Sequence, residues 1–365
     1  MQNIDPRDTE EVVEGLEPPE AGGWIDYPID ALKIRDERRS VIDVVRRINK
    51  NNFILDPDFQ REFLWSTQKQ SRLIESIILR IPLPVFYVAE NDAGELIVVD
   101  GRQRLTTLRE YFSGELVLDL PDQKDLHKKR FQNLETRLQN RIEDCQLHFY
   151  IIDHTVPERA RLDIFERVNG GEQLTRQQMR NAIYSGPAAR FLKDQACSEA
   201  FQAATGSSLN VKSMQDREFV NRFCAFALLP IEEYKSDMDA WLGAGLKALA
   251  AKSDQDRAIL GARLQTGLKN SFQLFGRHSF RKHLPDATAR GILNASLFDV
   301  MMSTLADKDP DVVIERAAII RRAFFELLKC EVFNTAITFS PNTAKQVRTR
   351  FRLASESMAG AFYVD

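Results

Sequence analysis

The sequence has no long hydrophobic run and no excess of charge of one sign. Its 365 residues contain 50 lysines and arginines against 53 acidic residues, a formal net charge of −3. This balance excludes a uniformly basic coat, so any nucleic-acid contact must come from a local patch. No apolar run approaches the about 18 residues of a membrane-spanning helix, and the N-terminus has no apolar signal segment. We therefore expect a cytoplasmic protein without a membrane partner.

Cysteine and histidine are scarce, and several well-known catalytic motifs are missing. The four cysteines form no CxxC pair, and the five histidines form no HExxH motif or zinc-type spacing. Reduced thiols are the expected state of the cysteines. The sequence also lacks a GxxxxGK[ST] loop, a GxSxG elbow and a GxGxxG fingerprint with an acidic partner. Any chemistry must therefore come from other residues.

Pattern and composition divide the chain into three parts. Residues 1–24 carry seven acidic residues and one arginine, which is typical of a flexible tail. Strand patterns concentrate before residue 155, and helical patterns dominate after it. We predict an α+β protein in which a small mixed α/β domain over 25–155 precedes a mainly helical domain over 156–365.

Local signals predict individual elements. Ser66 and Thr175 precede helical patterns as capping residues, and Thr155 with Glu158 has the spacing of a capping box. Strands are expected over 85–89, 95–99 and 145–152, and helices over 40–49, 66–81, 102–112, 211–229, 238–251, 254–276, 290–305, 310–330 and 342–358.

The strongest candidate site is the segment Asp100-Gly101-Arg102-Gln103-Arg104, where a predicted strand meets a predicted helix. A helix N-terminus presents unpaired N–H groups and a positive dipole end, which receive phosphate readily. Gly101 lets the backbone approach an anion closely, and the two arginines offer forked donors. With phosphate bound, Asp100 would hold a Mg²⁺ ion or orient water.

The same segment also has a purely structural interpretation. Asp100 is a good N-cap residue, and Gln103 stands where a capping-box glutamine belongs. At the other end of the chain, Lys345, Arg348 and Arg352 share one face of a predicted helix. That face either is simply solvated or contacts DNA phosphates.

Three motifs together resemble the N-terminal family of GmrSD-type restriction endonucleases, a ParB/sulfiredoxin-like group with a DGQQR signature. The resemblance covers about residues 26–300, and no HNH nuclease domain follows. The motifs are Asp58-Phe59-Gln60-Arg61 with Trp65-Ser66, the segment from Asp100 to Leu108, and Phe165-x-Arg167-x-Asn169 with Leu174-Thr175.

The resemblance implies a ParB-like α/β unit followed by a helical bundle. It also implies that the signature loop binds and hydrolyses a nucleoside triphosphate. Because Asp100 would hold a Mg²⁺ ion beside bound phosphate, Mg²⁺ is the expected cofactor. Catalytic roles are implied for Asp100, Gln103 and Arg104. Nucleotide-binding roles are implied for Gln60, Arg61, Gly101, Arg102, Thr106, Arg167 and Asn169.

We therefore expect an NTPase subunit of a bacterial anti-phage or modified-DNA restriction system. DNA cleavage would come from a partner nuclease subunit, and the chain would associate with DNA or with further copies of itself. Two positions depart from the family pattern: Arg102 replaces the usual glutamine, and Gln178 replaces a common glutamate.

The alternative is a non-enzymatic ParB-like module that binds DNA or protein and uses the DGRQR loop as a phosphate site. Direct nuclease activity ranks third, because no metal cluster is visible in the sequence. Asp100 distinguishes the NTPase hypothesis from the binding-module hypothesis. Catalysis needs its carboxylate, whereas phosphate binding alone tolerates asparagine.

Overall fold

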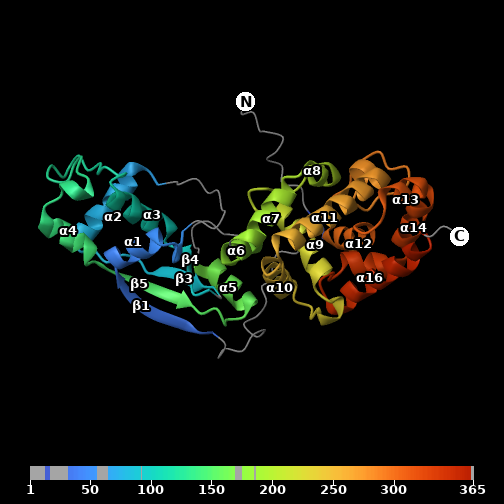
Figure 1. The fold of residues 1–365 in the computed structure, drawn as a ribbon, viewed down its shortest axis with the longest axis horizontal. Coiled ribbons are helices and arrows are strands. Elements are labelled where there is room, and N and C mark those ends of the chain that lie inside the picture. The colour runs from blue at the N-terminus through green and yellow to red at the C-terminus, as the bar shows by residue number, and fades with distance from the viewer. Residues whose placement is uncertain are drawn as a thin grey trace. The chain divides into compact units, whose positions relative to one another are not determined.

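The computed structural model describes residues 13–16, 32–55, 65–91, 93–168, 175–184 and 186–362. The chain divides into two compact units, one of residues 24–185 and one of residues 186–365 with 1–23. The first contains a five-stranded sheet and the second is helical, so the expected α+β class is confirmed (Figure 1). Among the described residues, no helix is long and apolar enough to cross a membrane.

The sheet of the first unit is mixed. Its strand order is β1-β5-β3-β4-β2, with the β1/β5 and β3/β4 pairs antiparallel and the β5/β3 and β4/β2 pairs parallel. The strands are β1 (Ile34–Ser40), β2 (Phe53–Ile54), β3 (Phe86–Glu90), β4 (Leu96–Asp100) and β5 (Gln146–Ile152).

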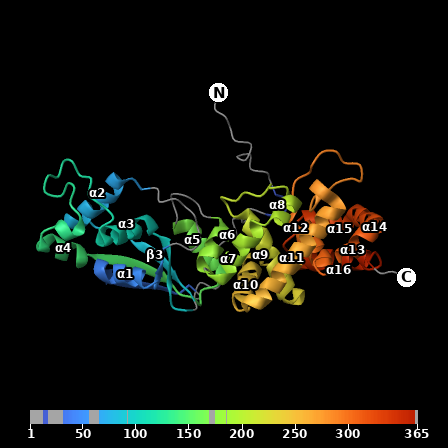
Figure 2. The same ribbon diagram turned by 45° about the horizontal axis from the view of Figure 1, so that its top comes forward.

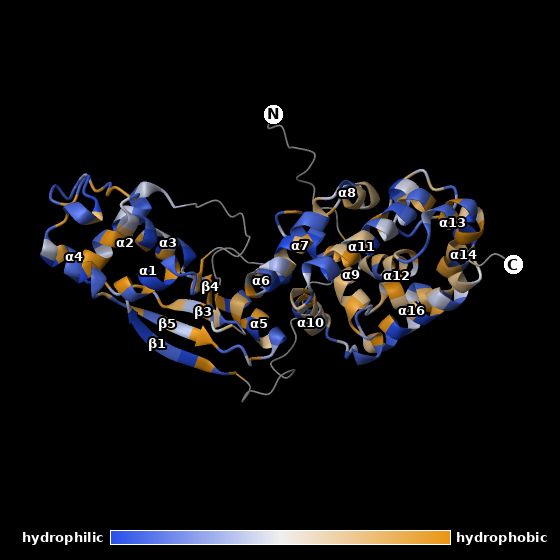
Figure 3. Cartoon of the chain, viewed as in Figure 1, coloured by the Kyte–Doolittle hydropathy of each residue, from blue (hydrophilic) through white to orange (hydrophobic). Residues whose placement is uncertain are grey.

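Strand β1 lies at the edge of the sheet and is almost entirely hydrophilic (Figure 3). Its sequence shows no apolar alternation, so the sequence pattern did not predict it. Antiparallel pairing with β5 along its whole length satisfies one side of its backbone. Ion pairs add further contacts, including Arg35 with Glu90 at 3.0 Å and Arg39 with Glu37 at 2.5 Å. Charged edge strands of this kind also resist pairing with other chains.

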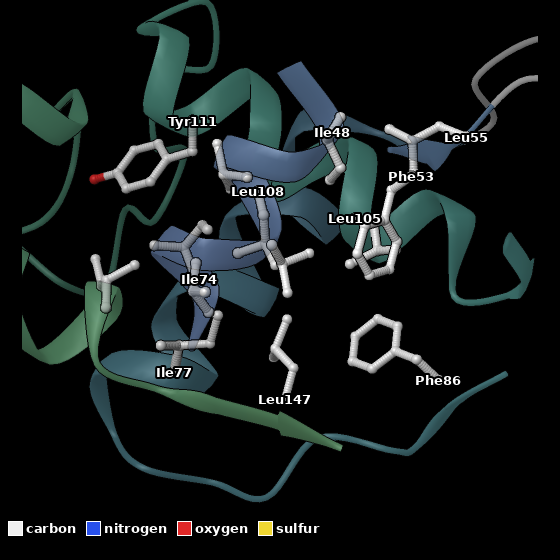
Figure 4. Close-up of a cluster of buried hydrophobic side chains, with 14 of the residues drawn as sticks. Ile48, Phe53, Leu55, Ile74, Ile77, Phe86, Leu105, Leu108, Tyr111 and Leu147 are labelled. Carbon is white, nitrogen blue, oxygen red and sulfur yellow. The ribbon is translucent and has the colours of Figure 1, made fainter. Parts of the chain in front are cut away.

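Four helices pack on one face of the sheet and form its main core (Figure 4). Ser40 and Ser66 cap the first two through their side chains, as expected for Ser66 from the sequence. Ile74, Leu105 and Leu108 reach the strand residues Phe86 and Phe149 in this core. The helices are α1 (Val41–Asn49), α2 (Thr67–Ile78), α3 (Arg102–Ser113) and α4 (Thr136–Glu143).

Two further helices, α5 (Glu158–Val168) and α6 (Arg176–Ile183), cover part of the opposite face. Phe165 of α5 and Met179 of α6 pack in one cluster with Val99 and Ile152 of the sheet. Because of this packing, both helices belong to the sheet-containing unit, which extends to residue 185 rather than to residue 155.

The second unit is built around α12, which contacts α9, α11, α15 and α16 (Figure 2). Helix α12 begins at Ala295, five residues later than the predicted 290, because Leu293 forms a β-bridge with Arg281. The helices are α7 (Pro187–Ala196), α8 (Glu199–Thr205), α9 (Gln215–Leu228), α10 (Met238–Ala250), α11 (Asp254–Phe275), α12 (Ala295–Leu305), α13 (Pro310–Glu315), α14 (Ala317–Lys329), α15 (Glu331–Thr338) and α16 (Ala344–Ala359).

A fully buried charge cluster joins α9, α12 and α16. Asp299 accepts two hydrogen bonds from Arg222, at 2.8 and 2.6 Å, and one from Arg350 at 2.9 Å. The exposed fraction of all three side chains is 1% or less. Burial lowers the pKa of Arg350 to about 10, so it remains protonated at neutral pH. One carboxylate therefore pairs with two buried guanidinium groups.

Residues 13–16 lie within the segment expected to be a free tail, yet they pack on the helical unit. The Glu14 N–H donates to the Leu293 carbonyl at 2.8 Å, and the Ala295 N–H donates to the Glu14 carbonyl at 2.9 Å. The Glu14 carboxylate also pairs with Lys282 at 2.6 Å. These contacts hold the short segment to the start of α12.

Candidate functional site

The loop between β4 and α3 places a glycine of positive φ at a helix N-terminus. Gly101 is the N-cap residue of α3, with φ +97° and ψ 7°, and within the described residues no side-chain cap bond is made to the helix. A Cβ atom at Gly101 would lie 2.3 Å from Cδ1 of Phe86. The conformation and the close approach to Phe86 both require glycine. The positive dipole end of α3 therefore opens directly at this loop, which is a favourable position for an anion.

The structural interpretation of Asp100 and Gln103 as a capping pair is wrong. The N-cap is Gly101, one residue later than that interpretation requires. The Asp100 carboxylate instead accepts a hydrogen bond from Arg104 at 2.9 Å, and 39% of the Asp100 side chain is exposed. Asp100 therefore lies beside the helix N-terminus without occupying it.

Arg104 is buried and engaged within the protein. Its guanidinium donates to the carbonyls of Pro84 and Val85 and to Asp100, and it lies 4.2 Å from the ring centre of Phe86. Burial lowers the pKa of Arg104, an effect that the charge of Asp100 opposes. Because its N–H groups donate to these three acceptors, Arg104 holds the Asp100 carboxylate in place and fixes the backbone just before β3.

The other residues of α3 that were expected in the site lie in the first two turns of the helix. Arg102 and Gln103 are half-buried, and Thr106 is buried. The Oε1 atom of Gln103 is buried without a hydrogen-bond partner among the described residues. An unpaired buried oxygen costs about 1–3 kcal/mol, so a donor on a ligand would offset a real penalty.

The remaining predicted nucleotide-binding residues are only partly described. Gln60, Arg61 and Asn169 fall outside the described residues. Arg167 is exposed in the last turn of α5. The Thr175 capping box is confirmed, because Gln178 N–H donates to Thr175 Oγ1 at 3.2 Å and Thr175 N–H donates to Gln178 Oε1 at 2.7 Å. Glutamine thus serves where the family often has glutamate.

Helix α6 carries a buried polar face to which the sequence analysis assigned no role. Gln177, Arg180 and Asn181 are at most 1% exposed. Arg180 Nε donates to Gln177 Oε1 at 3.0 Å, and Gln177 Nε2 donates to Asn181 Oδ1 at 2.8 Å. The i, i+3, i+4 spacing of these residues indicates that they share one face of the helix. It does not indicate burial, because the polar face of a helix normally points to solvent. Burying an arginine is costly, so this face must stay hydrogen-bonded.

The structure brings together an acidic cluster that the sequence did not reveal. One ligand-type atom each of Glu90, Asp153 and His154 lies within 4.8 Å of the others. Arg35 bridges the two carboxylates at 3.0 and 3.1 Å. Its charge offsets one of the two negative charges, and the ion pairs tie β1 to the ends of β3 and β5.

Two of the three C-terminal basic residues are engaged. Arg348 donates to the carbonyls of Glu232 and Tyr234 at 2.9 and 3.3 Å. Arg352 pairs with Glu356 at 2.8 Å, and Lys345 is exposed. DNA binding by this face stays a prediction, and the Glu356 carboxylate reduces the positive charge available for it.

The helical unit contains a polar pocket of about 440 Å³ between α7 and α11. Arginine and aspartate side chains from both helices line it, so it carries charge of both signs. The charged lining residues are Arg190, Asp194, Asp254 and Arg257. It is part of the helical unit and is distinct from the Gly101 loop in the first unit.

Replacing Gly101 by alanine is expected to destabilise the first unit by about 1–3 kcal/mol, since strain and contact with Phe86 add together. Gly94→Ala is the matched control, because Gly94 has φ +77° but open space around its Cβ position. It should cost only the conformational term of about 1 kcal/mol. Urea unfolding measures both variants, and equal losses would show that the Phe86 contact is unimportant.

Comparison with known proteins gives one family. Residues 41–185 match the family model of the GmrSD restriction endonuclease, N-terminal domain. The matched region lies within the sheet-containing unit and includes the Gly101 loop. No curated protein and no solved structure matches the chain.

Proposed function

We propose that the sheet-containing unit binds a nucleoside triphosphate at the Gly101 loop and hydrolyses it. The match of residues 41–185 to the GmrSD restriction endonuclease N-terminal domain supports the proposal. The family associates the unit with restriction-type defence. In the proposed system, the chain works in the cytoplasm and a partner subunit supplies any DNA cleavage.

The N-terminus of α3, with glycine as its N-cap and the partly exposed Asp100 carboxylate beside it, carries this proposal. Phosphate oxygens would accept from the first N–H groups of α3, where the helix dipole favours negative charge. Glycine at position 101 keeps side-chain atoms away from that position. Arg102, the first residue of the helix, would add a charge-assisted contact to the phosphates.

Asp100 fits a Mg²⁺–nucleotide complex. Proteins hold Mg²⁺ through one or two carboxylates together with the phosphates of the substrate. One oxygen of Asp100 bonds Arg104, and the other makes no hydrogen bond within the described part of the chain. A bound Mg²⁺ would neutralise charge on the phosphate oxygens.

The other residues of the loop have supporting roles in this proposal. Arg104 fixes the orientation of Asp100, so it is a positioning residue. Gln103 offers an unpaired Oε1 that would accept a hydrogen bond from the nucleotide or from water. The alternative, a module that binds phosphate without hydrolysis, uses the same N–H groups but gives the carboxylate of Asp100 no chemical task.

Titration calorimetry with non-hydrolysable triphosphates and Mg²⁺ tests the binding site. Arg102→Ala should weaken binding by about 1–3 kcal/mol, the usual effect of losing a charge-assisted hydrogen bond. Arg109→Ala is the matched control, because Arg109 lies on the same helix about 10 Å further along. Equal affinity of wild type and Arg102→Ala would remove Arg102 from the site, and no binding by wild type would overturn the proposal.

A further inference from the structure

The helical unit contains a second pocket, which lies between α12 and α16 and has a volume of about 510 Å³. Side chains of α9, α12 and α16, and of the short segments that follow these helices, form its lining. All of these elements belong to the helical unit. Pockets of about 300–1,000 Å³ are typical of sites for small molecules, so this one is large enough to hold a ligand.

Most of the residues that line this pocket are apolar. The rings of Phe226 in α9 and Phe351 in α16 have their centres 4.9 Å apart, with their planes at 38°. Both rings are only partly buried and pack at the margin of the nearest core cluster. Val300, Met358 and Phe362 are buried and complete the apolar lining. A ligand with an apolar body would therefore cover aromatic surface that the core leaves partly open to water.

The pocket also has a charged group that a ligand can pair with. The ammonium group of Lys308 lines the pocket and lies 4.9 Å from the ring centre of Phe362. Within the described residues, Lys308 forms no ion pair. The neighbouring acid, Asp307, is engaged with Arg263, which donates to both of its oxygens at 2.7 Å. One positive charge is thus left beside an apolar lining.

A buried amide fixes the backbone that carries this lysine. The side-chain N–H groups of Asn270 in α11 donate to the carbonyls of Leu305 and Lys308, at 3.0 and 2.9 Å. Asn270 is only 1% exposed. The end of α12 is therefore held in one position, and Lys308 extends from a rigid part of the unit.

We propose that this pocket binds a small organic acid. Its apolar body, a ring or a short chain, would pack against Phe226 and Phe351, and its acidic group would pair with Lys308. The proposal goes beyond the proposed function, because the pocket lies in the helical unit and does not include the Gly101 loop. An alcohol with the same body would lack the charge, and inorganic phosphate would lack the body.

Calorimetric titration of the whole chain tests the role of the charge. The probes are phenylbutyrate, phenylbutanol and inorganic phosphate at millimolar concentrations. Phenylbutyrate should bind about tenfold more tightly than phenylbutanol, because only the acid makes a hydrogen bond between charged groups. Lys308→Met should remove this difference. Lys345→Met, at an exposed lysine of α16, should retain it.

A blocking substitution tests the location. Ser355 is exposed on α16 and lines the pocket, so Ser355→Phe should fill part of it and abolish binding of both phenyl probes. Ser357→Phe is the matched control, because Ser357 is exposed on the same helix but is not among the residues that line the pocket. Trp241, whose ring centre lies 5.7 Å from that of Phe226, provides a second readout through its fluorescence.

Every other outcome overturns the proposal. Equal wild-type affinities for phenylbutyrate and phenylbutanol would show that Lys308 does not select an acid. Phosphate binding as tightly as phenylbutyrate would show that the apolar lining contributes nothing. Unchanged binding in Ser355→Phe, or an equal loss in Ser357→Phe, would place the probe elsewhere. No binding of phenylbutyrate by the wild type would remove the site, and none of these results bears on the Gly101 loop.

Discussion

Replacing Asp299 by asparagine should destabilise the helical unit by about 3–5 kcal/mol. The substitution removes the carboxylate that pairs with both Arg222 and Arg350, and both arginines are fully buried. Breaking a buried ion pair from one side leaves an uncompensated charge in a medium of low dielectric constant, which causes losses of this size. Urea unfolding followed by the fluorescence of Trp241, the only tryptophan of this unit, measures the effect.

Asp307→Asn is the matched control. Asp307 also forms a two-pronged pair with an arginine, Arg263, at 2.7 Å, but 57% of its side chain is exposed. Exposed pairs contribute about 0–1 kcal/mol. Comparable losses for the two variants would mean that burial does not set the importance of the Asp299 cluster.

Asp100→Asn should lower triphosphate hydrolysis by at least about 100-fold. In the proposed mechanism the carboxylate holds Mg²⁺ or orients the attacking water, and asparagine does neither as well. Losses of about 10²–10⁴-fold are typical when a positioned acid–base group is removed. Phosphate release from each triphosphate with Mg²⁺ measures the rate, and circular dichroism verifies that the variant is folded.

The exposed Asp122 provides the control for this substitution. Asp122→Asn removes the same charge from the same unit and should leave the rate unchanged. A wild-type rate in Asp100→Asn would show that the residue only anchors Arg104. The module that binds phosphate without hydrolysis would then become the better account.

Local signals predicted the elements whose ends are fixed by neighbouring residues. Ser66 and Thr175 cap helices as expected, because a side-chain oxygen reaches an N–H only two or three residues away. The prediction that Thr155 forms a capping box with Glu158 was wrong, because another nearby acceptor engages Thr155. Its hydroxyl and its N–H both donate to the nearby Asp153 carboxylate, at 2.7 and 2.9 Å, and α5 begins later, at Glu158.

Long-range contacts explain what the sequence could not predict. Strand β1 carries five charged residues in seven, and only its pairing with β5 reveals it as a strand. Residues 13–16 lie within an acidic stretch that is typical of a tail, yet Leu293 and Lys282 hold Glu14 from a distant part of the chain. Such contacts leave no local pattern.

In the candidate site, too, the sequence predicted the local features but not the long-range contacts. The Asp100–Arg104 segment was found from its residues, since glycine and arginine at a strand–helix junction are a local signal. The engagement of Arg104 with Pro84 and Val85 was not foreseen, because these carbonyls lie about 20 residues earlier in the chain.

A structure of the full chain with a non-hydrolysable nucleoside triphosphate and Mg²⁺ tests the central claim most directly. The account predicts phosphate oxygens against the first N–H groups of α3 and the metal ion on Asp100. A nucleotide seated elsewhere would contradict it, for example in the pocket between α7 and α11. So would the absence of bound nucleotide at saturating concentration.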